Sequence, residues 1–431
     1  FWITATYLFL VLSRAALFDT ERILSTLGDY QAHCLYLLSV LDGRIPSCEQ
    51  IYVATHSPYF YYLHAPITHW LLAQGVGVGV AIRLTTIVGI LIHIVILIGT
   101  LAIILRMLQR FIRKSWAAIL AFLAIATNIP VFQLPLWWNQ ETLSFFFACA
   151  VIYATVCMID EGIRPKKAVL LCLATGLGLL VKYTILLPVA VSAIFLCFVR
   201  DAGWKKAVLI ASLFAIVTVG SAHLYQLSQS KNYCFNMRKF SLDFYKGVPL
   251  NQDAPVEEYG KFDCSIFTNS GYYPYVSPYV GSKAGQITNL YWTFFNRSKP
   301  AFDPGCPRFT KYRLISLWTG TLIFLLFLAK VIENFVLAAK RKSVEWIDFY
   351  CLSLFVLGIL GALFYTLSAP RGWIATIQYI LYVIPLMIFL AFRVFNAVRP
   401  ASEELRFRVL ITVITLTFVF GNLLCGTPLP S

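Results

Sequence analysis

The chain has 431 residues, of which 59% are hydrophobic and only 13% are charged, and its mean hydropathy is +0.74. Soluble domains carry about 25% charged residues, so this composition excludes a soluble globular protein and indicates a polytopic membrane protein. The formal net charge is +15, but the basic residues gather in short loops between apolar segments. Such a distribution orients a chain in a bilayer, so nucleic-acid binding is not needed to explain it.

Apolar segments close to the roughly 20 residues that cross a bilayer recur along the whole chain. They occur at residues 1–18, 80–105, 115–134, 142–159, 206–227, 314–332, 349–366, 373–392 and 409–424. We interpret the first of them as a retained anchor, because it lacks an obvious signal-cleavage sequence. The pattern predicts an all-α polytopic membrane protein, a bundle of about 11 transmembrane helices.

Segment 168–199 is too long for one crossing and has basic residues on both sides. Two helices of about 14 residues, joined near Lys182 and Tyr183, satisfy the positive-inside rule and reach only about 21 Å each. The tip of this short hairpin should therefore place Lys182 in or just below the outer interface. A cation there needs an anion or water, and a lipid phosphate is one such partner. The alternative is that Lys182 simply extends to the headgroups.

The same topology leaves two large segments on the outer side, residues 19–79 and 228–313. We therefore divide the chain into a transmembrane module at 1–227 that includes the first outer loop, a large outer loop at 228–313, and C-terminal transmembrane helices at 314–431. Short interfacial helices are expected in the outer loops.

In the first outer loop, a helical pattern opens at Asp29 and ends at Asp42-Gly43. Asp29, His33 and Tyr36 fall on one stripe of that helix. A carboxylate beside an imidazole and a phenol suits general-base chemistry on an acceptor hydroxyl or amide. The alternative is that Asp29 only caps the helix.

Further along this loop, Ser57-Pro58 predicts the start of a short aromatic helix at 59–63, which Pro66 should bend. Its tyrosines favour headgroup depth, so it should lie along the interface. Nearby His56 has no carboxylate spacing typical of a metal site. A second outer acid, Glu141, follows Asn139 at the start of the span at 142–159. Either helix-dipole complementarity or an active-site role explains a glutamate at that place.

These features occur in one order, ending with the residues Gly-Leu-Gly-Leu-Leu-Val-Lys-Tyr-Thr at 176–184. This order resembles the GT-C superfamily of membrane glycosyltransferases, especially its branch of protein mannosyltransferases and aminoarabinose-type lipid transferases. The resemblance covers the first half of the chain. The chain departs from the family where His56-Ser57-Pro58 stands for His-Pro-Pro, where Gln378-Tyr379 stands for Arg-Tyr, and where Tyr30 follows the outer aspartate in place of an acid.

The resemblance implies a GT-C-like bundle and a polyprenyl-phosphate-linked sugar donor. It implies that Asp29 and Glu141 are the catalytic acids, and that Lys182 and Arg371 bind the leaving phosphate. We expect the remaining substrate contacts to come from Tyr30, His33, His56, Tyr59 and Tyr183.

No cofactor is required by this scheme, because lysine and arginine can carry the phosphate charge, and a divalent metal stays open. The expected partners are the lipid-linked sugar donor, a lipid, glycan or protein acceptor, and membrane lipids, without nucleic acid. The protein should lie in a bacterial inner membrane or the endoplasmic reticulum membrane, with its site facing the periplasm or lumen. Two alternatives are a noncatalytic structural subunit of a membrane complex and a lipid or solute transporter.

Overall fold

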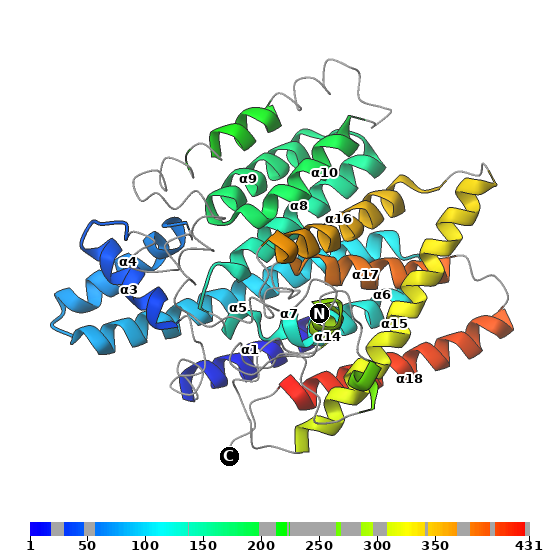
Figure 1. The fold of residues 1–431 in the computed structure, drawn as a ribbon, viewed down its shortest axis with the longest axis horizontal. Coiled ribbons are helices and arrows are strands. Elements are labelled where there is room, and N and C mark those ends of the chain that lie inside the picture. Colours follow the sequence, from blue (N-terminus) through cyan, green and yellow to red (C-terminus); the bar gives the residue numbers. More distant parts are fainter. Residues whose placement is uncertain are drawn as a thin grey trace. The chain divides into compact units, whose positions relative to one another are not determined.

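The computed structural model describes residues 1–18, 30–46, 57–136, 138–197, 213–221, 224, 264–268, 286–295, 308–340, 344–368, 380–396 and 401–426. Within those ranges every regular element is a helix and there is no β-strand (Figure 1). The prediction of an all-α protein is therefore confirmed.

Five of the described helices are long and apolar enough to cross a membrane. They are α5 (Val78–Phe111), α8 (Glu141–Glu161), α15 (Arg308–Ala339), α16 (Trp346–Ser368) and α18 (Ala401–Gly426). Shorter apolar helices are α1 (Trp2–Phe18), α6 (Ser115–Thr127), α10 (Leu186–Leu196) and α17 (Val383–Arg393). The predicted number of about 11 spans is thus not confirmed, and the predicted spans at 206–227 and 373–392 lie partly outside the described residues.

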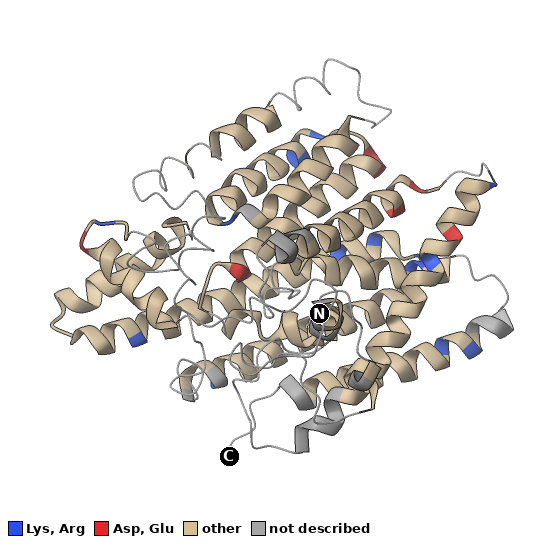
Figure 2. Cartoon of the chain, viewed as in Figure 1, with Lys and Arg blue, Asp and Glu red and all other residues tan. Residues whose placement is uncertain are grey.

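The long helices are uncharged along most of their length, and Figure 2 shows them mainly as tan stretches with few blue or red residues. Large apolar side chains also lie on their outer surfaces. On α15, for example, Ile332 is 62% exposed and Phe335 is 65% exposed. An apolar surface of this kind is stable against lipid and unfavourable in water. The helices therefore support an integral membrane protein.

The chain divides into two compact units. The first unit comprises Trp2–Thr100 and Leu134–Pro249, and the second comprises Phe1, Leu101–Gln133 and Leu250–Ser431. Helix α5 contributes residues to both units, because the division falls between Thr100 and Leu101.

In the first unit, α3 (Tyr30–Leu41) packs on α4 (Tyr59–Ala73). Helix α3 ends as predicted, because Gly43 adopts a φ of 70° and its N–H bonds to the carbonyl of Val40 at 3.0 Å. The predicted short helix at 59–63 is wrong in length, since α4 is 15 residues long and includes Pro66. A proline inside a helix costs stability because it removes one backbone hydrogen bond. Helix α4 compensates for that cost by burying four side chains, those of Phe60, Tyr61, His64 and Thr68.

The second layer of the first unit is formed by α8 against α9 (Pro165–Val181) and α10. Helices α8 and α9 approach closely at Gly178. A Cβ atom on that residue would lie 2.9 Å from the Cβ of Phe147 on α8 and 2.7 Å from the Cδ1 of Ile185. The absence of a side chain at Gly178 therefore permits the close packing of α9 against α8.

In the second unit, α15 packs against α17 and α18, and α18 also packs against α6. The predicted span at 115–134 is wrong as one helix. Helix α6 ends at Thr127, Asn128 has a ψ of 125°, and the four-residue helix α7 (Ile129–Phe132) follows. Pro130 has no N–H and its ring would clash with the preceding turn, so it cannot continue α6, whereas it fits the first turn of α7. The Asn128 amide instead donates to the carbonyl of Phe294, at 2.9 Å, in α14 (Gln286–Phe295).

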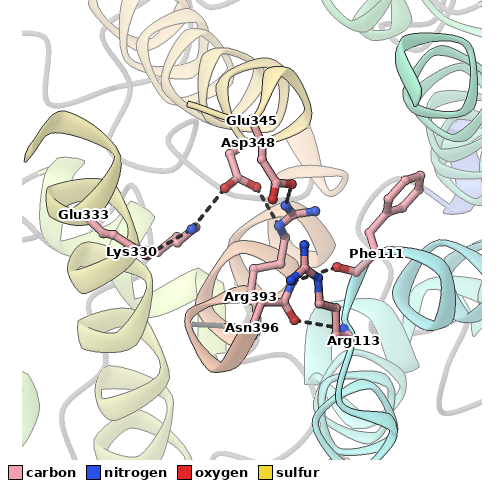
Figure 3. Close-up of polar contacts among 8 residues, drawn as sticks. All are labelled: Phe111, Arg113, Lys330, Glu333, Glu345, Asp348, Arg393 and Asn396. Atoms are coloured by element: carbon pink, nitrogen blue, oxygen red, sulfur yellow. Dashed lines mark hydrogen bonds and ion pairs between the residues drawn. The ribbon is translucent and has the colours of Figure 1, made fainter. Parts of the chain in front are cut away.

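A network of buried charges joins α15, α16 and α17 within the second unit (Figure 3). Lys330 Nζ lies 3.1 Å from Asp348 and 2.9 Å from Glu333. Arg393 Nε lies 2.6 Å from the other oxygen of Asp348, and the same guanidinium pairs with Glu345. Asp348 is only 1% exposed and Arg393 only 2%. Each buried charge thus has an opposite partner, as burial in an apolar bundle requires.

The end of α5 is tied to the same region through Asn396, in the short helix η6 (Val394–Asn396). The Asn396 Oδ1 accepts a hydrogen bond from the Arg113 backbone N–H at 2.8 Å, and its Nδ2 donates to the carbonyl of Phe111 at 3.0 Å (Figure 3). These bonds satisfy backbone groups that the end of a helix leaves without partners.

Candidate functional site

The first component of the site is the N-terminus of α8, which begins at Glu141. The Glu141 side chain is only 9% exposed, and its backbone N–H donates to Asn139 Oδ1 at 3.0 Å. A negative charge at this place is stabilised by the positive end of the helix dipole.

The second component is the tip of the hairpin formed by α9 and α10, with the short helix η3 (Tyr183–Ile185) between them. The predicted division of segment 168–199 near Lys182 is confirmed. Lys182 has extended backbone, with φ −162° and ψ 138°, and its N–H donates to the carbonyl of Gly178 at 2.9 Å. The tip thus turns just after the last helical residue, Val181.

The structure brings these two components together. The Lys182 ammonium donates to Glu141 Oε1, and the two side chains are 13% and 9% exposed. One turn further along α8, the Ser144 hydroxyl lies 3.0 Å from the Thr184 hydroxyl. The ion pair and this hydrogen bond fix the hairpin tip against the first turn of α8.

The pair is suited to hold an anion beside a carboxylate. An ammonium group has three donors, so Lys182 can bind more than one acceptor at a time, Glu141 among them. Because both charges are largely shielded from water, each acts more strongly than it would on a surface. A phosphate that carries increasing charge would be stabilised there.

A second group of residues surrounds Trp138, three residues before Glu141. We name it the aromatic–histidine cluster, and its members are Tyr30, His33, Tyr36, Phe60, Tyr61, His64, His93 and Trp138. The Trp138 ring centroid lies 6.0 Å from that of Tyr30 and 6.4 Å from that of His33, both on α3. The predicted first outer loop therefore lies beside the segment that leads into α8.

Hydrogen bonds order the polar atoms of this cluster. The Tyr30 hydroxyl lies 3.2 Å from the Thr86 hydroxyl, and His33 Nδ1 lies 2.6 Å from the Tyr61 hydroxyl. His64 Nδ1 lies 2.8 Å from the carbonyl of Phe60, and because a carbonyl only accepts, this nitrogen carries the proton. The Nε2 of a neutral His64 is then the acceptor.

Burial keeps three titratable groups of this region neutral. It raises the pKa of the Tyr30 hydroxyl, and it raises the pKa of the neighbouring Cys34 thiol to about 11. Burial also lowers the pKa of His64. At neutral pH the phenol and the thiol are therefore protonated and the His64 imidazole is uncharged.

The remaining predicted site residues differ in what can be said of them. Tyr59 is the first residue of α4 and is half-buried. Tyr183 begins η3, but its side chain lies outside the described residues, as do the whole of Asp29, His56 and Arg371. The roles of all these residues stay predictions.

Sequence reasoning missed several residues that the structure brings to the site. Ser144 and Thr184 gave no signal, since hydroxyl residues are common in apolar helices. The only sequence signal for Trp138 was its position close to Glu141. Gly89, which lies beside Trp138, gave no signal because it stands within an apolar segment without other distinguishing residues. Among the residues that the structure describes, no group of three or more His, Cys, Asp or Glu side chains is suited to a metal ion.

No protein-family model matches the sequence, and no curated protein matches it. Several solved structures share its fold, among them the following two. One is the archaeal oligosaccharyltransferase AglB from Archaeoglobus fulgidus, in complex with an inhibitory peptide and a dolichol-phosphate, with a TM-score of 0.52 at 10% identity. The other is the apo form of the Archaeoglobus fulgidus oligosaccharyltransferase, with a TM-score of 0.51 at 12% identity.

Each alignment covers 100% of this chain and 56% of the solved chain, so this chain spans little more than half the length of the two enzymes. At such low identity the likeness shows the fold alone, and it does not distinguish the branch that the sequence resemblance suggested. The chain therefore has a fold similar to that of the Archaeoglobus fulgidus oligosaccharyltransferase.

Proposed function

We propose that this protein is an integral-membrane glycosyltransferase that moves a sugar from a polyprenyl-phosphate-linked donor to an acceptor at the outer membrane face. The observation that carries the proposal is the shielded Glu141–Lys182 pair at the tip of the hairpin. It occurs in a chain whose fold is similar to that of an oligosaccharyltransferase solved with a dolichol-phosphate.

The reaction is a displacement at the anomeric carbon. An acceptor oxygen or nitrogen forms a bond to that carbon while the bond between the carbon and the phosphate oxygen breaks. The polyprenyl phosphate leaves with the electron pair, and the acceptor proton passes to a carboxylate. One displacement inverts the anomeric configuration.

Lys182 binds the leaving phosphate and stabilises the charge that develops on it. Glu141 keeps the ammonium in place before the donor arrives, and Arg371 supplies a second cation to the phosphate. Asp29 orients or deprotonates the acceptor. Its chain neighbour Tyr30 contacts Trp138, so α3 begins beside the segment that leads to Glu141.

A peptide is the acceptor that we place first, because the AglB structure holds an inhibitory peptide. A lipid or glycan acceptor is the other outcome of the same assay. His33 is 3% exposed and hydrogen-bonded to Tyr61. We therefore assign it a structural role, in which it holds α3 against α4, and not a contact with the acceptor.

The test is transfer from a panel of labelled polyprenyl-phosphate sugars to peptide, lipid and glycan acceptors by the purified protein in liposomes. Lys182→Met should lower the turnover number about 100-fold or more, the loss typical of removing one group that stabilises a developing anion. Asp29→Asn should lower it by at least about 100-fold. Lys166→Met provides the matched control, because Lys166 is exposed in the first turn of the same helix α9.

Equal turnover by Lys182→Met and Lys166→Met would reject the phosphate-binding role of Lys182. A folded parent protein that transfers no sugar from any donor in the panel would favour the noncatalytic subunit instead.

A further inference from the structure

The geometry points to Trp138 as a positioning residue: seated against Gly89, it holds the N-terminus of α8, and with it Glu141, at a fixed position relative to α3 and α4. The effect on sugar transfer rests on the proposed function. The mechanical coupling between these helices does not, and it can be measured separately.

The contacts of Trp138 connect the three helices. The residue is 1% exposed, and its ring centroid lies 5.8 Å from that of Phe60 and 5.5 Å from that of His64, both on α4. It also contacts Tyr30 and His33 on α3, as described above. Only two residues, Asn139 and Gln140, separate it from Glu141. A shift of the indole therefore moves the start of α8 directly.

Gly89 of α5 makes room for this arrangement. A Cβ atom on Gly89 would lie 2.6 Å from Trp138 Nε1 and 2.8 Å from His64 Nε2, which is closer than Cβ contacts in real proteins. His64 is itself held by its bond to the Phe60 carbonyl. One methyl group at residue 89 would thus push Trp138 and His64 away from α5, and the first helix turn of α8 would follow.

The indole is held by shape and not by a polar bond. Among the residues that the structure describes, the buried Trp138 Nε1 has no hydrogen-bond partner. Replacing Trp138 with phenylalanine therefore breaks no hydrogen bond, and it removes the part of the indole that meets residue 89. The two substitutions should compensate each other, which a purely local loss of stability would not do.

The experiment compares Gly89→Ala, Trp138→Phe and the double variant in lipid nanodiscs. Gly99→Ala is the control, because Gly99 lies on the same helix and a Cβ there meets no atom within 4 Å. Gly89→Ala should lower the turnover number at least about tenfold, since small displacements of catalytic groups are costly, while the affinity for polyprenyl phosphate changes by less than about twofold. The double variant should recover the part of the turnover that is lost to the clash with the indole, because the Cβ at residue 89 still meets His64.

Hydrogen exchange of the backbone provides a measurement that needs no activity. Gly89→Ala should increase exchange both in α3 and in the first turns of α8, the double variant should reverse the increase, and Gly99→Ala should leave both segments unchanged. The inference is overturned if Gly89→Ala matches Gly99→Ala, or if its effects and those of Trp138→Phe simply add. A parent protein that shows this exchange pattern but no sugar transfer would refute the proposed function and leave the coupling intact.

Discussion

Removing the charge of Lys182 alone should destabilise the protein more than removing both charges of the Glu141–Lys182 pair. The Lys182→Met variant leaves the Glu141 carboxylate largely shielded from water, at 9% side-chain exposure, without its partner. Breaking a buried pair on one side costs about 3–5 kcal/mol, whereas replacing both members by neutral groups of similar volume is often nearly neutral. The double variant Glu141→Gln with Lys182→Met should therefore recover most of the loss.

The magnitude can be stated as a shift of the unfolding temperature. In a unit of 150–250 residues, 1 kcal/mol corresponds to about 2–4 °C, so a cost of about 3–5 kcal/mol should lower the unfolding temperature of the single variant by roughly 6–20 °C. The assay is thermal unfolding in nanodiscs, which does not depend on any substrate. Lys166→Met is again the control and should shift the temperature by less than about 2 °C, because an exposed surface charge contributes little.

A double variant that is as unstable as Lys182→Met would contradict the expected recovery. In that case the loss would come from the packing of the lysine stem, and the ion pair would contribute little. A second refuting result is the absence of any shift in the single variant, which would mean that water reaches the pair freely.

Three further predictions concern stability. Burial lowers the pKa of His64, so as the pH falls below about 6.5 the imidazole is protonated in the unfolded state before it is protonated in the folded state. The unfolding temperature should therefore decrease from pH 7 to pH 5, and His64→Gln should make this decrease smaller. Asp348→Asn leaves two buried cations without their shared anion and should cost about 3–5 kcal/mol, while Glu333→Gln, at 33% side-chain exposure, should cost under about 1 kcal/mol in the same unfolding assay. Gly178→Ala should cost about 1–3 kcal/mol because its Cβ would lie 2.7 Å from Ile185 Cδ1, and equal unfolding temperatures for this variant and Gly99→Ala would contradict the close approach.

Where the sequence-based predictions failed, packing between distant segments outweighed a local signal. The helix that begins at Tyr59 was expected to end at residue 63, but the buried face of α4 extends past Pro66 to Thr68, whose hydroxyl lies 2.8 Å from that of Thr85 on α5. The span at 115–134 was expected to be continuous, but Asn128 interrupts it and bonds to α14. Neither partner can be recognised from neighbouring residues.

Three features of this protein depend on local chemistry and could be predicted from the sequence alone. Its composition established the helical membrane class, its basic loops divided the hairpin near Lys182, and Gly43 marked the end of α3, because these signals act within one helix or one turn. The pairing of Lys182 with Glu141 and the contacts of Trp138 with α3 and α4 follow from the packing of the helices and not from any local signal. An apolar helix is hydrophobic on all its faces, so its residue pattern does not indicate which face meets which neighbour. The pairing of side chains across helices is therefore set by how their shapes and their few charges fit once the helices pack.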